Sequence, residues 1–222
     1  QENNTELKYS FSFLKHPVVV RSSAIGEDSE RKSYAGIFQS YLNIFSYENY
    51  VQSVGKVCTD INNKLLNLYA PGSRKIKMAV LVQEFVPSEY SGVLFTANPM
   101  TGNRDEIVLE YFSGLGTSVV NGETTPHHFT IDKYSCEISQ KIFSKSGIAY
   151  YPKKNGGIKK KIIRNSEIKL LSRMQLRQIT KISIEIEKIF RVPQDIEWAI
   201  YKGELKIVQT RPITELPQSL IT

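Results

Sequence analysis

Residues 193–212 read PQDIEWAIYKGELKIVQTRP, and they predict two β-strands joined by a turn at Lys202-Gly203. Because side chains alternate along a strand, one face of the first strand holds its apolar residues: Ile196, Trp198 and Ile200. The other face holds two acids, Asp195 and Glu197. The same period places four residues on one face of the second strand: Leu205, Ile207, Gln209 and Arg211.

The length of the turn decides which polar residues face each other across this hairpin. A two-residue loop would pair Ile196 with Gln209 and leave Glu197 on the other face. A three-residue loop over 202–204 would give two opposed polar pairs: Glu197 with Gln209, and Asp195 with Arg211. We expect the three-residue loop, because only that register brings the polar groups together.

Two acids, an amide and an arginine at this spacing suit a metal-bound polyphosphate. Glu197 and Gln209 offer the hard oxygen atoms that Mg²⁺ prefers as ligands. Arg211 offers a planar fork of donors to phosphate oxygens. The alternative interpretation is an edge hairpin whose charges are solvated, and periodicity alone favours neither.

Composition limits the possible classes of protein. The 222 residues allow one large or two small domains, and the chain begins with glutamine, as expected of a fragment or a processed piece. No apolar run approaches the roughly 20 residues of a membrane span, and no signal peptide is recognisable. Cys58 and Cys136 are isolated, which indicates a reducing cytoplasm and argues against a zinc or disulfide framework. The net charge of +7 permits an anionic ligand.

The rest of the chain predicts an α+β fold, with mixed or antiparallel sheets and flanking helices. One helix begins after Ser46 and ends before Pro71-Gly72. Another begins at Ser172, which forms a capping box with Gln175. Its expected buried stripe is Leu176, Ile179, Ile182, Ile186 and Ile189. Apolar or alternating strands are expected in six further places: 18–20, 33–44, 78–86, 91–97, 107–111 and 129–131.

Three other features attract attention, and we expect none of them to be catalytic. The basic run 153–164 is typical of a solvated loop and lacks the aromatic residues that stack nucleic-acid bases. His127-His128 has no ligand at metal spacing, so we expect a structural pair. The glycine-rich segment 113–117 is neither a Walker loop nor GxGxxG, and suits a tight turn or a phosphate-side loop.

Arg21 ends the apolar strand 18–20 and is followed by Ser22, Ser23 and Gly26, a setting that suits a phosphate contact. Three blocks in this order resemble one known family: VVVRSSAIGEDSERKSYAGIFQSYLNI (18–44), MAVLVQEFVPSEYSGVLFTANPMTGNRDEIVLEYFSGLGTSVVNGETTP (78–126) and PQDIEWAIYKGELKIVQTRPIT (193–214). The family is the ATP-binding domain of the pyruvate phosphate dikinase group, which includes phosphoenolpyruvate synthase and rifampicin phosphotransferase.

The resemblance implies an ATP-grasp fold that binds Mg-ATP between its subdomains. In this family a phosphoryl group passes from ATP to a histidine on a swivelling domain, and then to pyruvate or rifampicin on a third domain. Carried over by position, Arg21 and Arg211 contact the phosphates as catalytic residues, and Glu197 and Gln209 hold Mg²⁺. The full set of expected nucleotide-site residues is Arg21, Gly36, Ser40, Gln83, Glu197, Gln209 and Arg211. Gln83 would lie near the adenine and the segment between subdomains.

The resemblance also implies domain boundaries. Residues 1–17 would be a tail or truncated edge, and residues 18–214 the C-terminal two-thirds of the domain, with subdomains near 18–75 and 76–214. Residues 215–222 would lead to a missing phosphohistidine domain. The chain departs from the family at Ile25 and Ser40, where threonine is usual, and at Thr117, where glutamate is usual.

Three hypotheses follow from the sequence. The first is the Mg-ATP-binding part of a cytoplasmic dikinase-type phosphotransferase, inactive alone because the front of the domain is missing. The second is a catalytically incomplete nucleotide-binding or interaction module descended from this family. The third, a basic nucleic-acid-binding domain, rests on charge alone, so we expect neither nucleic acid nor membrane among the partners. The acceptor is left open between pyruvate and rifampicin.

Overall fold

The computed structural model describes residues 2–24, 28–29, 32–33, 40–68, 78–164, 167–168, 170–213 and 215–217. The chain divides into two units, each with its own sheet and core. Unit 1 comprises residues 1–85 and 152–159, and unit 2 comprises residues 86–151 and 160–222. The first stretch of unit 1 ends at residue 85, whereas the resemblance implied subdomains near 18–75 and 76–214. A short segment from the middle of the chain also belongs with the N-terminal unit.

Unit 1 is built on a three-stranded antiparallel sheet. Its strands, in spatial order, are β4 (Tyr41–Ile44), β1 (Val18–Ala24) and β5 (Met78–Glu84). Helix α2 (Tyr47–Leu68) covers one face, where Val18 and Val20 are fully buried beside Tyr50 and Val57. The start of α2 follows the sequence prediction, since the Ser46 hydroxyl accepts a hydrogen bond from the Asn49 backbone N–H.

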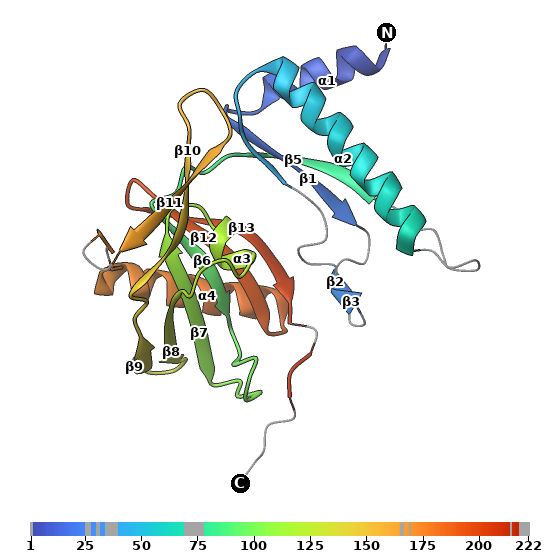
Figure 1. Ribbon diagram of the computed structural model, residues 1–222. Coiled ribbons are helices and arrows are strands. Elements are labelled where there is room, and N and C mark those ends of the chain that lie inside the picture. The colour runs from blue at the N-terminus through green and yellow to red at the C-terminus, as the bar shows by residue number, and fades with distance from the viewer. Residues whose placement is uncertain are drawn as a thin grey trace. The chain divides into compact units, whose positions relative to one another are not determined.

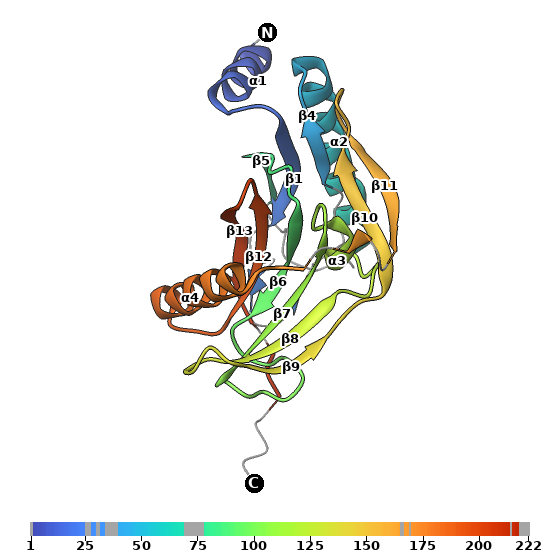
Figure 2. The same ribbon diagram turned by 90° about the vertical axis from the view of Figure 1, so that its left-hand side faces the viewer.

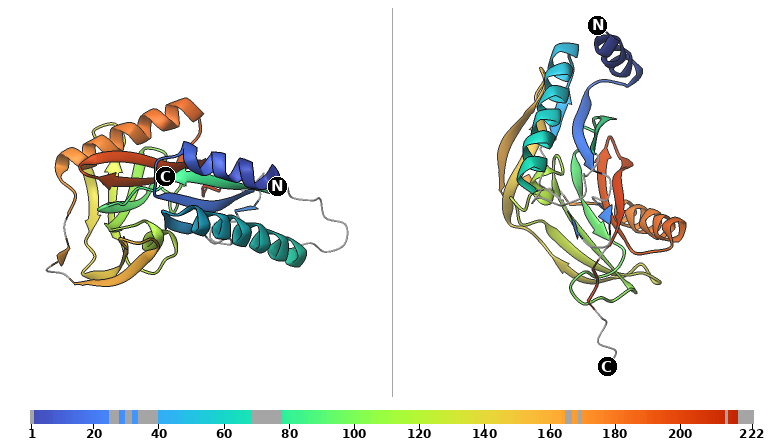
Figure 3. Two further views of the ribbon diagram at one scale, coloured as in Figure 1. Left: turned by 90° about the horizontal axis from the view of Figure 1, so that it is seen from above. Right: turned by 90° about the vertical axis from the view of Figure 1, so that its right-hand side faces the viewer.

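The expected N-terminal tail is instead a helix, α1 (Glu2–Phe13). Local pattern does not reveal it, because its apolar residues form only a narrow contact with α2 through Phe11, Tyr47 and Tyr50. Figure 3 shows α1 in dark blue and α2 in cyan. Of the expected strand 33–44, Tyr41–Ile44 forms β4, and residues 34–39 lie outside the described part of the chain. Two short strands, β2 (Asp28–Ser29) and β3 (Lys32–Ser33), pair with each other.

The basic run 153–164 belongs to a hairpin and not to a loop. Strands β10 (Ser146–Pro152) and β11 (Ile158–Arg164) form it, and its turn belongs to unit 1. Asn43 binds that turn: its side-chain amide donates to the Lys153 and Gly157 carbonyls at 2.8 and 2.7 Å. Asn43 has a positive φ of 61°, which asparagine tolerates better than most residues.

Unit 2 is built on a six-stranded antiparallel sheet (Figure 1). In spatial order its strands are β13 (Glu204–Pro212), β12 (Gln194–Tyr201), β6 (Tyr90–Phe95), β7 (Glu106–Ser113), β8 (His127–Asp132) and β9 (Ile138–Ile142). Helix α4 (Arg173–Phe190) lies along one face, as Figure 2 shows. The main core lies between them and includes Trp198, Tyr111 and Ile179.

The α+β class and the antiparallel sheets are confirmed. The Ser172–Gln175 capping box at the start of α4 is also confirmed. The predicted stripe of α4 is only half right: Leu176 and Ile179 are buried, whereas Ile189 is 74% exposed. The buried side turns instead through Thr180 and Ser183, whose hydroxyls bond to backbone carbonyls one turn earlier. Among the helices that the structure describes, none has the length and apolar character to span a bilayer.

Candidate functional site: a polar face on the unit 2 sheet

The hairpin of β12 and β13 closes more tightly than expected. Tyr201 pairs with Glu204, so the loop contains only Lys202 and Gly203. Both loop residues have positive φ, 51° and 78°, as in the two-residue turns whose twist matches that of the flanking strands. The expected three-residue loop is therefore wrong.

A β-bulge restores the expected pairing. Trp198 lies opposite Ile207, but Glu197 lies opposite Gln209, so Val208 is an extra residue in β13. Beyond the bulge, Asp195 lies opposite Arg211. The two polar pairs are thus confirmed, although a bulge and not the turn produces them. The expectation that Leu205, Ile207, Gln209 and Arg211 share one face is wrong, because the bulge moves the last two to the other side.

The two faces of this hairpin differ in burial and chemistry. Ile196, Trp198 and Ile200 are almost completely buried in the core under α4. Glu197 and Gln209 lie on the opposite face and are partly exposed. Directly opposed residues of an antiparallel pair hold their Cβ atoms about 4.5–5.5 Å apart. A carboxylate and an amide are therefore adjacent on a face that solvent reaches.

Asp195 and Arg211 form an ion pair on this polar face. The arginine Nε and Nη2 atoms both lie 2.8 Å from Oδ2 of the carboxylate. The aspartate side chain is 10% exposed and the arginine side chain 25% exposed. A partly desolvated carboxylate fixes the guanidinium plane more strongly than a fully solvated one, so Arg211 is held in a defined orientation.

The polar face continues across the sheet in a way that local sequence does not show. Glu197 also pairs with Val93 of β6, Val93 pairs with Glu110 of β7, and Glu110 pairs with His128 of β8. The Glu110 carboxylate lies 3.0 Å from Nδ1 of His128. Two strand spacings, about 10 Å, separate Glu110 from Glu197. The sequence analysis did not select Glu110, although it is the one charged residue in the otherwise apolar run IVLEYF.

The three described candidates of unit 1 lie in one part of its sheet. In the register of β1 with β5, Arg21 lies opposite Leu81 and Val19 lies opposite Gln83. These residues face away from α2, because Val18 and Val20 face it. Ser40, which is exposed, immediately precedes Tyr41, the partner of Val20, so its position adjoins that of Arg21. Gly36 and Ile25 lie outside the described residues.

The remaining sequence features have structural roles. His127 is 1% exposed, and its Nδ1 accepts a hydrogen bond from the Ser144 backbone N–H at 3.1 Å. Gly114, in the glycine-rich segment, has a positive φ of 82°, and its carbonyl accepts bonds from Ser88 and Ser91. This arrangement supports the tight-turn interpretation. No group of three or more metal-ligating His, Cys, Asp or Glu side chains occurs within the described parts of the chain.

The chain is thus an α+β protein of two units, and one face of the unit 2 sheet carries a carboxylate, an amide and an oriented arginine. Comparison with known proteins makes this class specific. The model of the pyruvate phosphate dikinase AMP/ATP-binding domain family matches residues 2–220, and the chain belongs to that family.

Individual relatives come from archaea and bacteria. The chain is 35% identical over 205 residues to a probable phosphoenolpyruvate synthase of Methanocaldococcus jannaschii. It is 34% identical over 208 residues to rifampicin phosphotransferase of Bacillus cereus, and 33% over 227 residues to phosphoenolpyruvate synthase of Pyrococcus furiosus. These alignments cover 90%, 91% and 96% of this chain, but only 17%, 24% and 28% of the relatives.

Proposed function

We propose that this chain binds Mg-ATP and supplies the phosphate-contacting part of a dikinase-type phosphotransferase with the ATP-grasp fold. The observation that carries the proposal is the polar face of the β12–β13 hairpin. There a bulge sets Glu197 opposite Gln209 and Asp195 opposite Arg211. Membership of an ATP-binding family supports the choice of ATP over other phosphate ligands.

Phosphoryl transfer needs held phosphates and neutralised charge more than covalent chemistry. On unit 2, Arg211 would hold a phosphate and neutralise its charge, because Asp195 already fixes the plane of the guanidinium group. Arg21 would supply a second cation from the face of the unit 1 sheet opposite to α2. We therefore assign Arg21 and Arg211 as the catalytic residues that contact the transferring phosphate.

The side chains on the polar face fit Mg²⁺. Glu197 and Gln209 are directly opposed and partly exposed, and each carries a side-chain oxygen atom of the kind that this cation prefers as a ligand. When bound there, Mg²⁺ would neutralise charge on the phosphate oxygens. Glu197 and Gln209 would hold it, and Arg211 would bind phosphate oxygens beside it.

Residues of unit 1 would contact the rest of the nucleotide. Gln83 lies two residues before the point where the chain passes into unit 2, which supports a position near the adenine and the segment between subdomains. Ser40 would line the nucleotide site through its exposed hydroxyl. We keep Gly36 as a predicted contact on the basis of the sequence resemblance alone.

The whole reaction would require parts found in longer relatives. We propose that residues 215–222 lead to a swivelling phosphohistidine domain, and that a third domain binds pyruvate or rifampicin. The names of the relatives, phosphoenolpyruvate synthase and rifampicin phosphotransferase, support these two acceptors. Two free cysteines in the described residues support a reducing cytoplasm. Neither nucleic acid nor a membrane is among the proposed partners.

A second candidate function is a catalytically incomplete nucleotide-binding or interaction module. Ile25 and Thr117 favour it, because an apolar side chain stands where threonine is usual and a neutral one where glutamate is usual. Ser40 in place of the usual threonine is a milder change, because the hydroxyl is kept. The intact Glu197–Gln209 and Asp195–Arg211 pairs favour the phosphotransferase. The two candidates differ in whether Mg-ATP binding depends on these pairs.

Calorimetric titration with Mg-ATP tests the proposal. Arg211→Ala should weaken binding by about 2 kcal/mol, because a charged hydrogen bond to phosphate is lost. Glu197→Gln should reduce the Mg²⁺ dependence of binding, because it removes the charged ligand. The matched controls are Lys206→Ala and Glu204→Gln, exposed residues of the same hairpin that pair with each other. Equal losses in test and control variants would contradict the assignment. Absence of Mg-ATP binding by the unaltered chain would contradict the proposal and favour an interaction module.

A further inference from the structure

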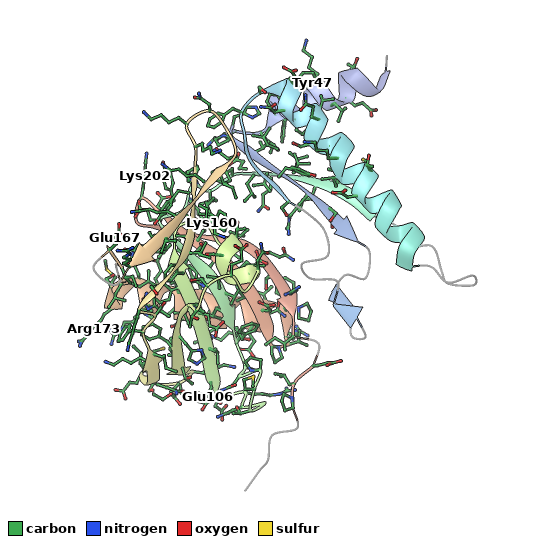
Figure 4. The ribbon with its side chains drawn as sticks, viewed as in Figure 1. Tyr47, Glu106, Lys160, Glu167, Arg173 and Lys202 are labelled. Carbon is green, nitrogen blue, oxygen red and sulfur yellow. The ribbon has the colours of Figure 1, made fainter. Side chains whose placement is uncertain are left out.

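The first half of helix α4 exposes a stripe of positive charge. Arg173, Arg177 and Lys181 follow one another at intervals of four residues, so they lie on one side of the helix. All three are exposed, and with Met174 and Gln178 they line a hollow in the surface. Figure 4 shows Arg173 pointing outward at the start of α4. The buried residues Leu176 and Ile179 lie on the other side of the helix, against the sheet.

This arrangement of charge does not help the helix to fold. The N-terminal end of a helix carries a partial positive charge, which acids stabilise and cations destabilise. The first turn of α4 has no acidic residue, and its exposed acids, such as Glu185, lie in the second half. Like charges four residues apart also repel each other. Residues that lower the stability of the element they belong to are expected mainly at functional positions.

The ion pairs among the described residues give the stripe no counter-ion. In the described residues, the ion pairs of α4 involve Glu185 with Lys188 and Glu187 with Lys133, both in the C-terminal half. None of the ion pairs formed by the described residues includes Arg173, Arg177 or Lys181. Met174, which directly follows Arg173 and lines the same hollow, is 78% exposed. The surface therefore combines planar cationic donors with an exposed, adaptable apolar side chain.

We propose that this stripe is a docking surface for an acidic segment of another protein or protein domain. Arginine binds carboxylates through two parallel hydrogen bonds, and Met174 offers an apolar contact of the kind that protein interfaces use. The lining of the hollow contains no aromatic residue on which nucleic-acid bases could stack. Three cations also fall short of the four to eight that mark surfaces for anionic lipids. The inference does not depend on ATP binding, since α4 lies on the opposite face of the sheet from Glu197 and Gln209.

Fluorescence anisotropy with the whole chain tests this proposal. The probe is a fluorescein-labelled peptide rich in glutamate and leucine, with a glutamine-for-glutamate peptide as the uncharged control. The double variant Arg173→Glu/Arg177→Glu should weaken binding by about tenfold or more, because attraction at two positions becomes repulsion. The matched variant Lys153→Glu/Lys154→Glu makes the same change in net charge on the exposed hairpin turn. It should change the affinity by less than about twofold.

Three outcomes would overturn the proposal. Equal weakening in the two double variants would mean that the peptide responds only to net charge. Tighter binding of an oligonucleotide or of phosphatidylserine vesicles than of the acidic peptide would assign the stripe to those ligands. A marked fall in the melting temperature of Arg173→Glu/Arg177→Glu would mean that the arginines serve folding. We expect the melting temperature to hold or rise, since acids suit the start of a helix.

Discussion

His127 is a single buried side chain that makes stability depend on pH. It packs among Tyr111, Phe112 and Phe143, and its Nδ1 accepts the Ser144 N–H. That bond favours the neutral ring with its proton on Nε2. Burial lowers the pKa of His127, because the surroundings disfavour the charged ring. The folded protein therefore binds this proton less readily than the unfolded chain does.

We predict that the free energy of unfolding falls as the pH drops below the ordinary histidine pKa of 6.5. The loss continues until the pH reaches the lowered pKa of the folded state. His127→Gln keeps an acceptor for Ser144 and removes the ring, so its urea midpoint should change less between about pH 7.5 and about pH 5.5. His16→Gln, which removes a histidine at an exposed position outside the unit 2 core, is the control. Identical pH dependence in all three proteins would contradict this role for His127.

Gly92 is required by close contact between strands. A methyl group at Gly92 would overlap the Glu110 carbonyl oxygen and the Tyr111 Cα atom, which are backbone atoms and cannot move aside. We expect Gly92→Ala to destabilise the protein by about 1–3 kcal/mol or more. Differential scanning calorimetry would measure the change.

The control for Gly92 is Gly55, an exposed position in the middle of helix α2 with open space around it. Gly55→Ala should stabilise the helix by about 0.5–1 kcal/mol, because alanine loses less backbone freedom on folding. If both substitutions had the same sign, contact at Gly92 would not be the cause.

Residue chemistry predicted part of the polar face directly. Glu197, Gln209 and Arg211 stood out because polar groups at a spacing of two are unusual in a strand that borders a core. Glu110 could have been selected from the sequence, because it is a lone acid among apolar residues. Its contact with His128 could not have been predicted, because it depends on the pairing of β7 with β8.

At the scale of elements, the pairing of polar residues across the β12–β13 hairpin depends on the position of the extra residue in β13. Without Val208 and without a bulge, Gln209 would follow Ile207 directly and would still lie opposite Glu197. Without Thr210, the two polar pairs cannot form together. If the bulge persisted, Arg211 would lie opposite Ile196 and no longer opposite Asp195. If the bulge closed, Gln209 would lie opposite Ile196 and no longer opposite Glu197.

We predict that deletion of Val208 leaves Mg-ATP affinity within about threefold, whereas deletion of Thr210 lowers it by tenfold or more, about 1.4 kcal/mol. Calorimetric titration measures the affinity, and circular dichroism confirms that both variants fold. The matched design removes one residue from the same strand in each case. Equal losses would show that strand length matters, and not the face on which each side chain lies.

Elements with strong local signals were predicted well. The beginnings of α2 and α4 follow from side-chain caps at Ser46 and Ser172, because a cap acts within one turn. Strand β9 was missed since every residue in it is exposed, so no alternation marks it. The bulge was invisible because it depends on two strands at once, and the turn prediction was wrong for the same reason.

At the scale of the whole molecule, the order of strands was beyond local reasoning. Strand β12 pairs with β6, about a hundred positions earlier in the chain, and only this pairing extends the polar face towards Glu110 and His128. The division into units also depends on contacts between distant parts of the chain. A hairpin turn whose partner is Asn43 belongs with unit 1 although its strands arise from the middle of the chain.

The placement of that hairpin turn limits how related genes can recombine. Because residues 152–159 belong to unit 1, the chain passes between the units three times, and neither unit is one continuous stretch of gene. A single recombination event between two relatives would therefore give a hybrid in which the turn and Asn43 come from different parents, unless the exchange falls outside 43–157. Exchange of a whole unit requires coordinated breakpoints. We therefore expect the two units to be inherited together, so that substitutions in one unit are selected in the presence of those in the other.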